Sequence, residues 1–89
     1  MTYVAVKHEV KDYDSWRKLF DEHKKMRKSS GEQSSRIFRG SSNRNEIFGL
    51  FKWESKEKAK KFFESKDLKE KMKEAGVSGE AHVHYLDET

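Results

Sequence analysis

The sequence predicts an α+β domain whose elements follow the order βαββαβ. Three segments alternate between apolar and polar residues, as strands do, a fourth is a short apolar run, and two segments between them carry apolar residues at helical spacing. The third strand is apolar on both sides, with Ile47, Phe51 and Trp53 on one and Phe48 and Leu50 on the other. A strand of this kind is covered on both faces of its sheet. One layer of helices covers a single face, so the sequence also predicts a second cover.

The composition indicates one folded domain, residues 1–89, with a thin core. Hydrophobic residues make up 33% of the chain and charged residues 40%, a balance that on its own would suggest disorder. The six Phe, three Tyr and two Trp nevertheless fall at periodic positions, with turn residues between the periodic blocks. A thin core in so short a chain favours completion of burial by a second chain.

The composition also excludes or disfavours several classes of protein. The chain has no Cys, which rules out disulfides, thiolate catalysis and Cys-based zinc sites. It has no apolar run of transmembrane length, and its first ten residues lack the pattern of a signal peptide, so we expect a cytoplasmic protein without a membrane partner. The 20 basic and 16 acidic residues are interspersed along the helices, which is typical of a solvated face rather than of a nucleic-acid footprint.

The first half of the chain predicts a strand, a helix and a second strand. Tyr3–Val10 is the first strand, and Asp12 is placed to cap a helix that runs from about Tyr13 to Lys28. Gly31 is the expected end of this helix, and Gln33–Arg39 is the second strand. One face of the first strand carries Val4, Val6, His8 and Val10, and one stripe of the helix carries Tyr13, Trp16, Phe20, His23 and Arg27.

The second half predicts a hairpin, a broken helix and a last strand. Residues 40–45 have turn chemistry and join the second strand to the third. Ser55 caps the next helix. The apolar residues of this helix form two stripes that are out of phase with each other, so we expect a break near Ser65–Asp67. Gly76 ends the helix, and the last strand spans roughly Glu80–Leu86. The two stripes consist of Ala59, Phe62 and Phe63 and of Leu68, Met72 and Ala75.

Two βαβ crossovers with right-handed connections convert this order into a ferredoxin-like fold. Its four-stranded antiparallel sheet carries both helical segments on one face. The other face of the central strand is apolar and needs a cover. We expect a homodimer in which two sheets pack face to face and form a closed or nearly closed α+β barrel.

Several segments together resemble a known family. The chain is similar to the dimeric α+β barrel proteins of the antibiotic-biosynthesis-monooxygenase-like superfamily, and within it to a small cyclase-like branch. The resemblance spans nearly the whole chain, and its most specific parts are D-Y-D-x-W at the first helix, F-R before the hairpin and A-G-V-x-G after the second helix. The segments are KHEVKDYDSWRKLFDEH (7 to 23), RIFRG (36 to 40), NEIFGLFKWESKEKAKKFFES (45 to 65), DLKEKMKEAGVSG (67 to 79) and YLDE (85 to 88).

The resemblance implies a homodimer and, for the activity, a range of possibilities. Members include cofactor-independent monooxygenases that act on aromatic polyketides, haem-degrading enzymes, and proteins without an assigned activity. The haem-degrading members carry an Asn, a Trp and a His at positions that fall here near Lys7, on Phe62 and on Met72. All three residues differ, so we expect no haem and no other cofactor.

The candidate site is a pocket between the helices and the sheet that takes a small aromatic or apolar ligand. His8 and His23 lie on the apolar sides of the first strand and first helix, where a pair of imidazoles can serve as acid and base near neutral pH. The expected ligand-binding residues around them are Trp16, Phe62, Tyr85 and Arg39. The same side chains can instead serve as core, dimer interface and ion pairs, and the protein would then be a non-catalytic structural or regulatory dimer.

The sequence leaves two further hypotheses open. His82 and His84 share one face of the last strand and could supply two metal ligands, with His8 as a third, although no recognised motif completes the set. RNA-recognition domains share the βαββαβ order and stack bases on aromatic residues of the third strand. Here Phe48 matches one stacking position, but Leu50 replaces the other and Glu46 stands where a basic residue belongs, so this reading is the weakest.

Overall fold

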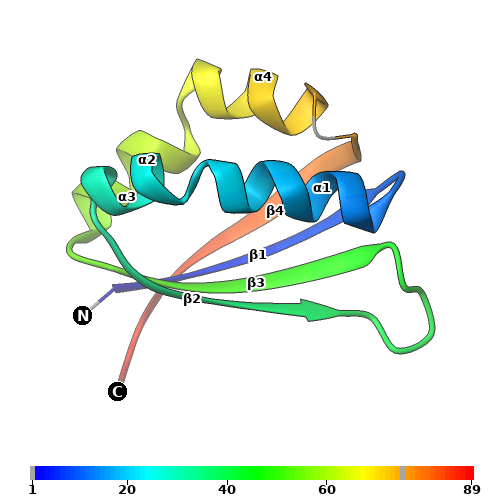
Figure 1. Cartoon of the computed structure of the whole chain (residues 1–89). Helices are drawn as coiled ribbons and strands as arrows, with labels where there is room; N and C mark the ends of the chain where they lie inside the picture. The colour runs from blue at the N-terminus through cyan, green and yellow to red at the C-terminus, as the bar shows by residue number, and fades with distance from the viewer. Residues whose placement is uncertain (1, 75) are drawn as a thin grey trace.

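The computed structural model describes residues 2–74 and 76–89, and its elements confirm the predicted ferredoxin-like fold (Figure 1). The four strands form one antiparallel sheet in the order β2-β3-β1-β4, and the helices lie together on one of its faces. The elements are β1 (Thr2–Val10), α1 (Tyr13–Glu22), α2 (Lys24–Ser30), β2 (Glu32–Arg39), β3 (Glu46–Trp53), α3 (Lys56–Phe63), α4 (Lys66–Glu74) and β4 (Val77–Asp87).

The central strand β1 places its apolar side toward the helices, as its alternating pattern predicts. Val4, Val6, His8 and Val10 are all buried, whereas Lys7 and Glu9 are exposed. Val4 pairs with Phe51 and His8 with Ile47 across β3, so the buried sides of the two strands coincide. The pairing with β4 shifts between Lys7 and Glu9. His8 therefore lies at an irregularity of the ladder.

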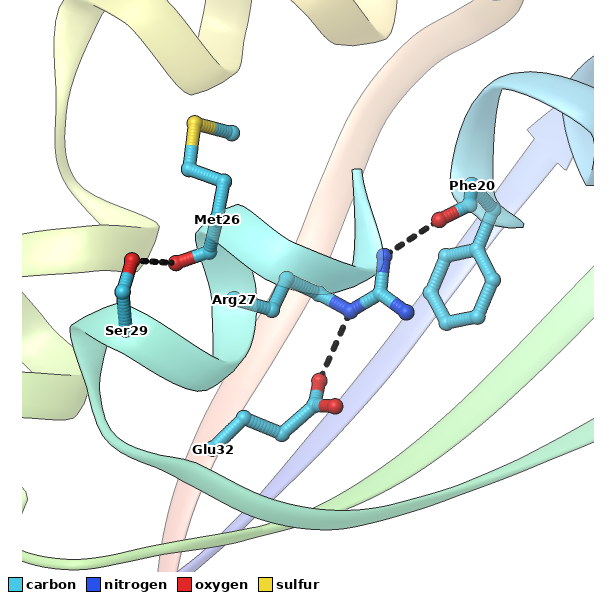
Figure 2. Close-up of polar contacts among 5 residues, drawn as sticks. All are labelled: Phe20, Met26, Arg27, Ser29 and Glu32. Atoms are coloured by element: carbon cyan, nitrogen blue, oxygen red, sulfur yellow. Dashed lines mark hydrogen bonds and ion pairs between the residues drawn. The ribbon is translucent and has the colours of Figure 1, made fainter. Parts of the chain in front are cut away.

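The first helical segment is divided at His23, which corrects the expectation of one helix from Tyr13 to Lys28. α1 ends at Glu22, α2 begins at Lys24, and His23 has φ −90° and ψ 8°. In an unbroken helix the carbonyl of Phe20 would accept the amide of Lys24. Here that carbonyl accepts a hydrogen bond from Nη1 of Arg27, and this long side chain supports the break (Figure 2). Gly31 ends α2 with a φ of 124°, as predicted.

A buried ion pair joins the end of α2 to the start of β2. Nε of Arg27 lies 2.8 Å from Oε2 of Glu32, and the two side chains are 7% and 2% exposed (Figure 2). The guanidinium carbon of Arg27 also lies 3.7 Å from the centre of the Phe20 ring. Burial of a charge is costly unless it is paired and hydrogen-bonded. Each charge thus offsets the cost of burying the other. The pair also joins the two ends of the turn at Gly31.

The predicted break in the second helical segment is confirmed. α3 ends at Phe63, α4 begins at Lys66, and the hydroxyl of Ser65 accepts the amide of Leu68 at 3.2 Å. The predicted stripe position Ala75 lies outside the described residues. β4 begins at Val77, earlier than the expected Glu80, because the strand resumes pairing with β1 beyond the irregularity, where Val77 faces Val10.

The two faces of the sheet differ in cover. On the helix side, the fully buried Ile47 and Trp53 and the buried Phe51 of β3 pack beneath the helices. On the other side, which we call the open face, Phe48 is 37% exposed and Phe38, directly opposite on β2, is 49% exposed. Leu86 of β4 is 44% exposed. Figure 1 shows this face bare of helices. One chain thus covers one of the two apolar sides of β3.

Glu32→Gln is expected to destabilise the fold, because it leaves the buried charge of Arg27 without its partner. Loss of one partner of a buried ion pair typically costs about 3 kcal/mol or more. The free energy of unfolding in urea at pH 7 measures this. Asp21→Asn breaks the exposed pair between Arg17 and Asp21 and serves as the control, with an expected change below about 1 kcal/mol. Equal changes in the two variants would contradict the assigned role of the buried pair.

Candidate functional site

A cavity of about 550 Å³ lies between the helices and the sheet. Its floor consists of small side chains of β1 and β4, namely Val6, Val77, Ala81 and Val83. Its roof includes Leu68 and Met72 of α4, a helix that has no buried residue. Small residues on the floor and a helix that does not reach down to them leave the space unfilled.

Aromatic rings form the wall of the cavity. Trp16 and Phe20 on α1 stack with ring centres 5.0 Å apart at 19°. Phe20 contacts Phe51 of β3 at 6.1 Å, and Phe51 contacts Phe63 of α3 at 5.6 Å. The four rings form a row in which each packs against the next, and Trp16, Phe20, Phe51 and Phe63 all line the cavity. Such a wall suits a flat, apolar ring system.

His8 is a buried polar residue beside this wall. Its ring lies 5.5 Å from the ring of Trp16, and the residue is 8% exposed. Neither ring nitrogen has a hydrogen-bond partner in the part of the molecule that the structure describes. Burial lowers the pKa of His8 to about 4, so the imidazole is neutral at pH 7. A neutral imidazole has one donor and one acceptor nitrogen, and both lack a partner in the described structure.

The structure brings four of the six predicted site residues around one cavity. His8, Trp16, His23 and Phe62 all line it. His23 is half-buried at the break between α1 and α2, where the chain leaves helical geometry. The two histidines come from different elements, β1 and the α1–α2 junction, and line the same cavity.

Tyr85 and Arg39 occupy other places. Tyr85 lies on the helix side of β4, where it packs against the main core, and Nζ of Lys60 lies 5.8 Å from its ring centre. Burial raises the pKa of the Tyr85 hydroxyl, with Glu64 contributing. The guanidinium of Arg39 stacks 4.0 Å over the ring of Tyr13, and its Nε donates to the carbonyl of Arg44 at 2.9 Å. The contacts of Arg39 are those of a residue that braces the β2–β3 hairpin.

Comparison with solved structures identifies the architecture. A crystal structure of an antibiotic biosynthesis monooxygenase superposes with a TM-score of 0.75, covering 100% of this chain and 99% of the other at 12% identity. The fold is that of the antibiotic biosynthesis monooxygenases. A variant of SnoaB, a cofactor-independent oxygenase from Streptomyces nogalater, matches with a TM-score of 0.74 at 8% identity, covering 98% of this chain and 91% of SnoaB.

A third monooxygenase-like structure holds a ligand. This monooxygenase from Streptomyces coelicolor, in complex with nanaomycin D, matches with a TM-score of 0.63 at 15% identity and covers 99% of this chain and 87% of its own. No protein-family model matches the sequence, and no curated protein matches it by sequence. The predicted resemblance is thus confirmed at the level of the monooxygenase-like fold.

The structure adds residues that the sequence did not single out for the site. Met26, Leu68, Lys71 and Met72 all line the cavity. Leu68 and Met72 were expected as an apolar stripe, and Lys71 lies three residues after Leu68 on the same side of α4. The spacing from Leu68 could have identified Lys71 as a cavity residue. The many charged residues of the segment obscure this signal.

The metal hypothesis for His8, His82 and His84 is wrong in its geometry. His82 and His84 are exposed on the open face, whereas His8 points to the helix side of the same sheet. Side chains on opposite faces of a sheet do not converge on one ion. Within the described residues, no group of three or more His, Cys, Asp or Glu side chains is placed to hold a metal.

None of the described helices is both long and apolar enough to span a bilayer.

The burial of His8 predicts a loss of stability in mild acid. Its pKa is 6.5 in an ordinary environment and about 4 in the fold, so the unfolded chain binds more protons between these values. Stability is therefore highest above pH 6.5 and falls as the pH drops toward 4, by on the order of 3 kcal/mol in total. Urea denaturation at pH 7 and pH 5 measures the difference.

His8→Leu is expected to remove most of that pH dependence, because a buried leucine does not titrate. His82→Gln changes an exposed histidine and should leave the dependence as it is in the wild type. If His8→Leu and the wild type lost the same stability between pH 7 and pH 5, the assignment of the buried neutral imidazole would be wrong.

Proposed function

We propose that the protein binds a flat aromatic molecule in the cavity and that His8 acts on it as a proton acceptor, in a cofactor-independent monooxygenase-like reaction. The observation that carries the proposal is the imidazole of His8, which is buried, neutral and without a partner in the described structure, on the wall of an aromatic-lined cavity. Buried polar groups normally have a partner, and each exception calls for an explanation. A ligand hydroxyl or acidic C–H would supply that partner.

The chemistry would need little from the protein beyond this base. An aromatic ring with an activated CH₂ group loses a proton to His8 and becomes electron-rich, and that carbanion reduces O₂. The CH₂ carbon becomes a C=O carbon, one oxygen atom of O₂ stays on it, and the other leaves as water. The four electrons come from that carbon, so no external reductant is required. The negative charge that develops on the ligand raises the pKa of His8 and so favours the proton transfer.

Other residues of the cavity have supporting roles in this proposal. Trp16 and Phe20 present stacked faces that would hold the ligand ring flat. His23, half-buried on the same cavity, is the candidate for the second proton-transfer group. Phe62 and the apolar floor would exclude water from the reacting carbon. Tyr85 and Arg39 have the positions of supporting residues and would act through the packing of β4 and of the hairpin.

We also propose that the protein works as a homodimer joined through the open faces of two sheets. The open face carries the opposed rings of Phe38 and Phe48, with Leu50 and Ala5 beside them around a shallow hollow. A contiguous exposed apolar patch of this kind marks an association surface. A second copy offers the same apolar surface and would cover the side of β3 that the helices leave bare. A single-stranded nucleic acid is a poorer candidate, because its backbone needs basic residues that the acidic Glu9 and Glu46 here offset.

Anthrone, a flat tricyclic compound with one activated CH₂ group, provides the test of the enzymatic proposal. The protein is expected to accelerate its oxidation by O₂ to anthraquinone over the rate in buffer, as followed by absorbance. His8→Leu should abolish the acceleration, since it removes the base. Ile47→Val trims a fully buried neighbour of His8 that does not line the cavity, and should keep the rate.

Three outcomes separate the parts of this proposal. Acceleration by the wild type and by Ile47→Val but not by His8→Leu supports it. Acceleration that survives in His8→Leu contradicts the role of His8. A wild-type rate equal to that in buffer contradicts the oxygenase proposal for this class of compound.

A further inference from the structure

Lys71 occupies a position where α4 should be apolar. Leu68, Lys71 and Met72 stand at i, i+3 and i+4, on one side of the helix, and all three are half-buried and line the cavity. A lysine on the apolar side of a helix usually extends its ammonium group out to water. Here Nζ of Lys71 instead lies 3.8 Å from Sδ of Met26, a thioether on the facing helix α2. The ammonium group is therefore held against the wall of the cavity.

The ammonium group of Lys71 has only a weak partner in the described part of the chain. A thioether sulfur is a weak acceptor. The ion pairs among the described residues join other side chains, namely Lys7 with Glu46, Arg17 with Asp21, Arg27 with Glu32, and Lys58 with Glu54. An ammonium group beside an apolar cavity gains most from a carboxylate or another anion. No protein group described here supplies one.

The charged residues in the described lining of the cavity are all positively charged. Arg27, Lys69, Lys71 and Lys73 line it, and its described lining contains no Asp or Glu. Arg27 is already engaged, since it pairs with Glu32 and donates to the carbonyl of Phe20. Figure 2 shows its guanidinium turned toward these two partners, while Met26 leaves α2 in another direction. Lys71, which contacts Met26, is thus the inward cation that remains available to a ligand.

Lys71 and His8 lie toward different ends of the cavity. Lys71 contacts Met26 of α2, and His8 contacts Trp16 of α1. Met26 and Trp16 are ten residues apart along two nearly continuous helices, which corresponds to roughly 15 Å. A ligand of two or three fused rings can reach toward both ends. An anionic group at the Lys71 end would orient the rings so that their far edge meets His8.

We propose that Lys71 binds a negatively charged group of the ligand, so that the cavity selects aromatic acids over neutral aromatic compounds. This inference rests on the proposed ligand-binding role of the cavity and names the class of ligand. Lys71 would be a specificity-determining and positioning residue, since it is remote from the group that accepts the proton. The two cations beside it, Lys69 and Lys73, add to the field that attracts an anion.

Two fluorescent probes that differ by one charged group test the inference. N-phenyl-1-naphthylamine is neutral, and 1-anilinonaphthalene-8-sulfonate has the same ring system with a sulfonate. The wild type should bind both and prefer the sulfonate. Lys71→Gln should weaken the sulfonate probe by about tenfold or more, since a charge-assisted hydrogen bond is lost, and change the neutral probe by less than about twofold. Lys66→Gln, an exposed lysine of the same helix outside the lining, is the matched control and should change neither.

A second variant and a second readout keep the test decisive. Lys71→Met restores the apolar pattern of α4, so it is expected to fold even if Lys71→Gln does not, and should also lose the preference for the sulfonate. Labelling of methionine methyl groups with ¹³C reports where the probes bind, because Met26 and Met72 both line the cavity. Their signals should shift on addition of either probe.

The possible results distinguish this inference from the proposed function beneath it. A preference for the sulfonate that disappears in both Lys71 variants supports the inference. Equal binding of the two probes to the wild type, or a preference unchanged in the variants, overturns the inference and leaves the cavity as a binding site. Loss of both probes in the Lys71 variants makes Lys71 a structural residue and also overturns it. If neither probe shifts the methionine signals of the wild type, the inference and the binding proposal both fail.

Discussion

The fold depends on a constraint in β3, a strand with apolar residues on both of its sides. Ile47, Phe51 and Trp53 pack beneath the helices, and Phe48 and Leu50 lie on the open face. Burial of apolar area is the main favourable term in folding, and a chain this small has little of it to spare. The helices satisfy one side of the strand. The arrangement of the sheet, the helix layer and the proposed dimer all follow from the need to cover both.

The cavity follows from how unevenly the helix side is filled. Large rings crowd the part of the interface under α1 and α3, where Phe20 and Phe62 meet the rings of β3 and Trp16 stacks on Phe20. Under α4 the floor is made of small residues such as Ala81 and Val83, and α4 itself sends down no fully buried side chain. Interiors are normally close-packed, and this partly open hollow instead leaves apolar side chains of a small core unpacked. Its retention is understandable if a ligand fills it.

The fold was largely predictable because its signals are local. Alternation placed the faces of the strands correctly, and Asp12, Ser55, Ser65 and Gly31 marked helix ends that the structure confirms. The break at His23 was not predictable from periodicity. It depends on the side chain of Arg27 taking the carbonyl of Phe20, and on the partner that Glu32 provides from the next strand.

The candidate site was predictable only in part, for a related reason. The pattern of a strand tells which face a residue occupies, but not where along that face a cavity lies. His8 and Tyr85 both lie on the helix side of the sheet, and only His8 lines the cavity. The sequence does not distinguish Lys71 from the many surface charges of its segment, because a helix so rich in lysine hides the one that faces inward. How deeply a lysine side chain is buried depends on how the helix packs on the sheet, and the sequence of the helix alone does not specify this.

The covering of both sides of β3 is the central claim, and the mass of the protein in solution tests it most directly. Light scattering at low micromolar concentration, in low salt and in high salt, distinguishes one chain of 10.6 kDa from two. We predict the mass of a dimer in both, because contact between apolar faces is not screened by salt and is strengthened by salts that favour burial. The mass of a single chain would contradict the account, since Phe38 and Phe48 would then stay exposed on an uncovered sheet.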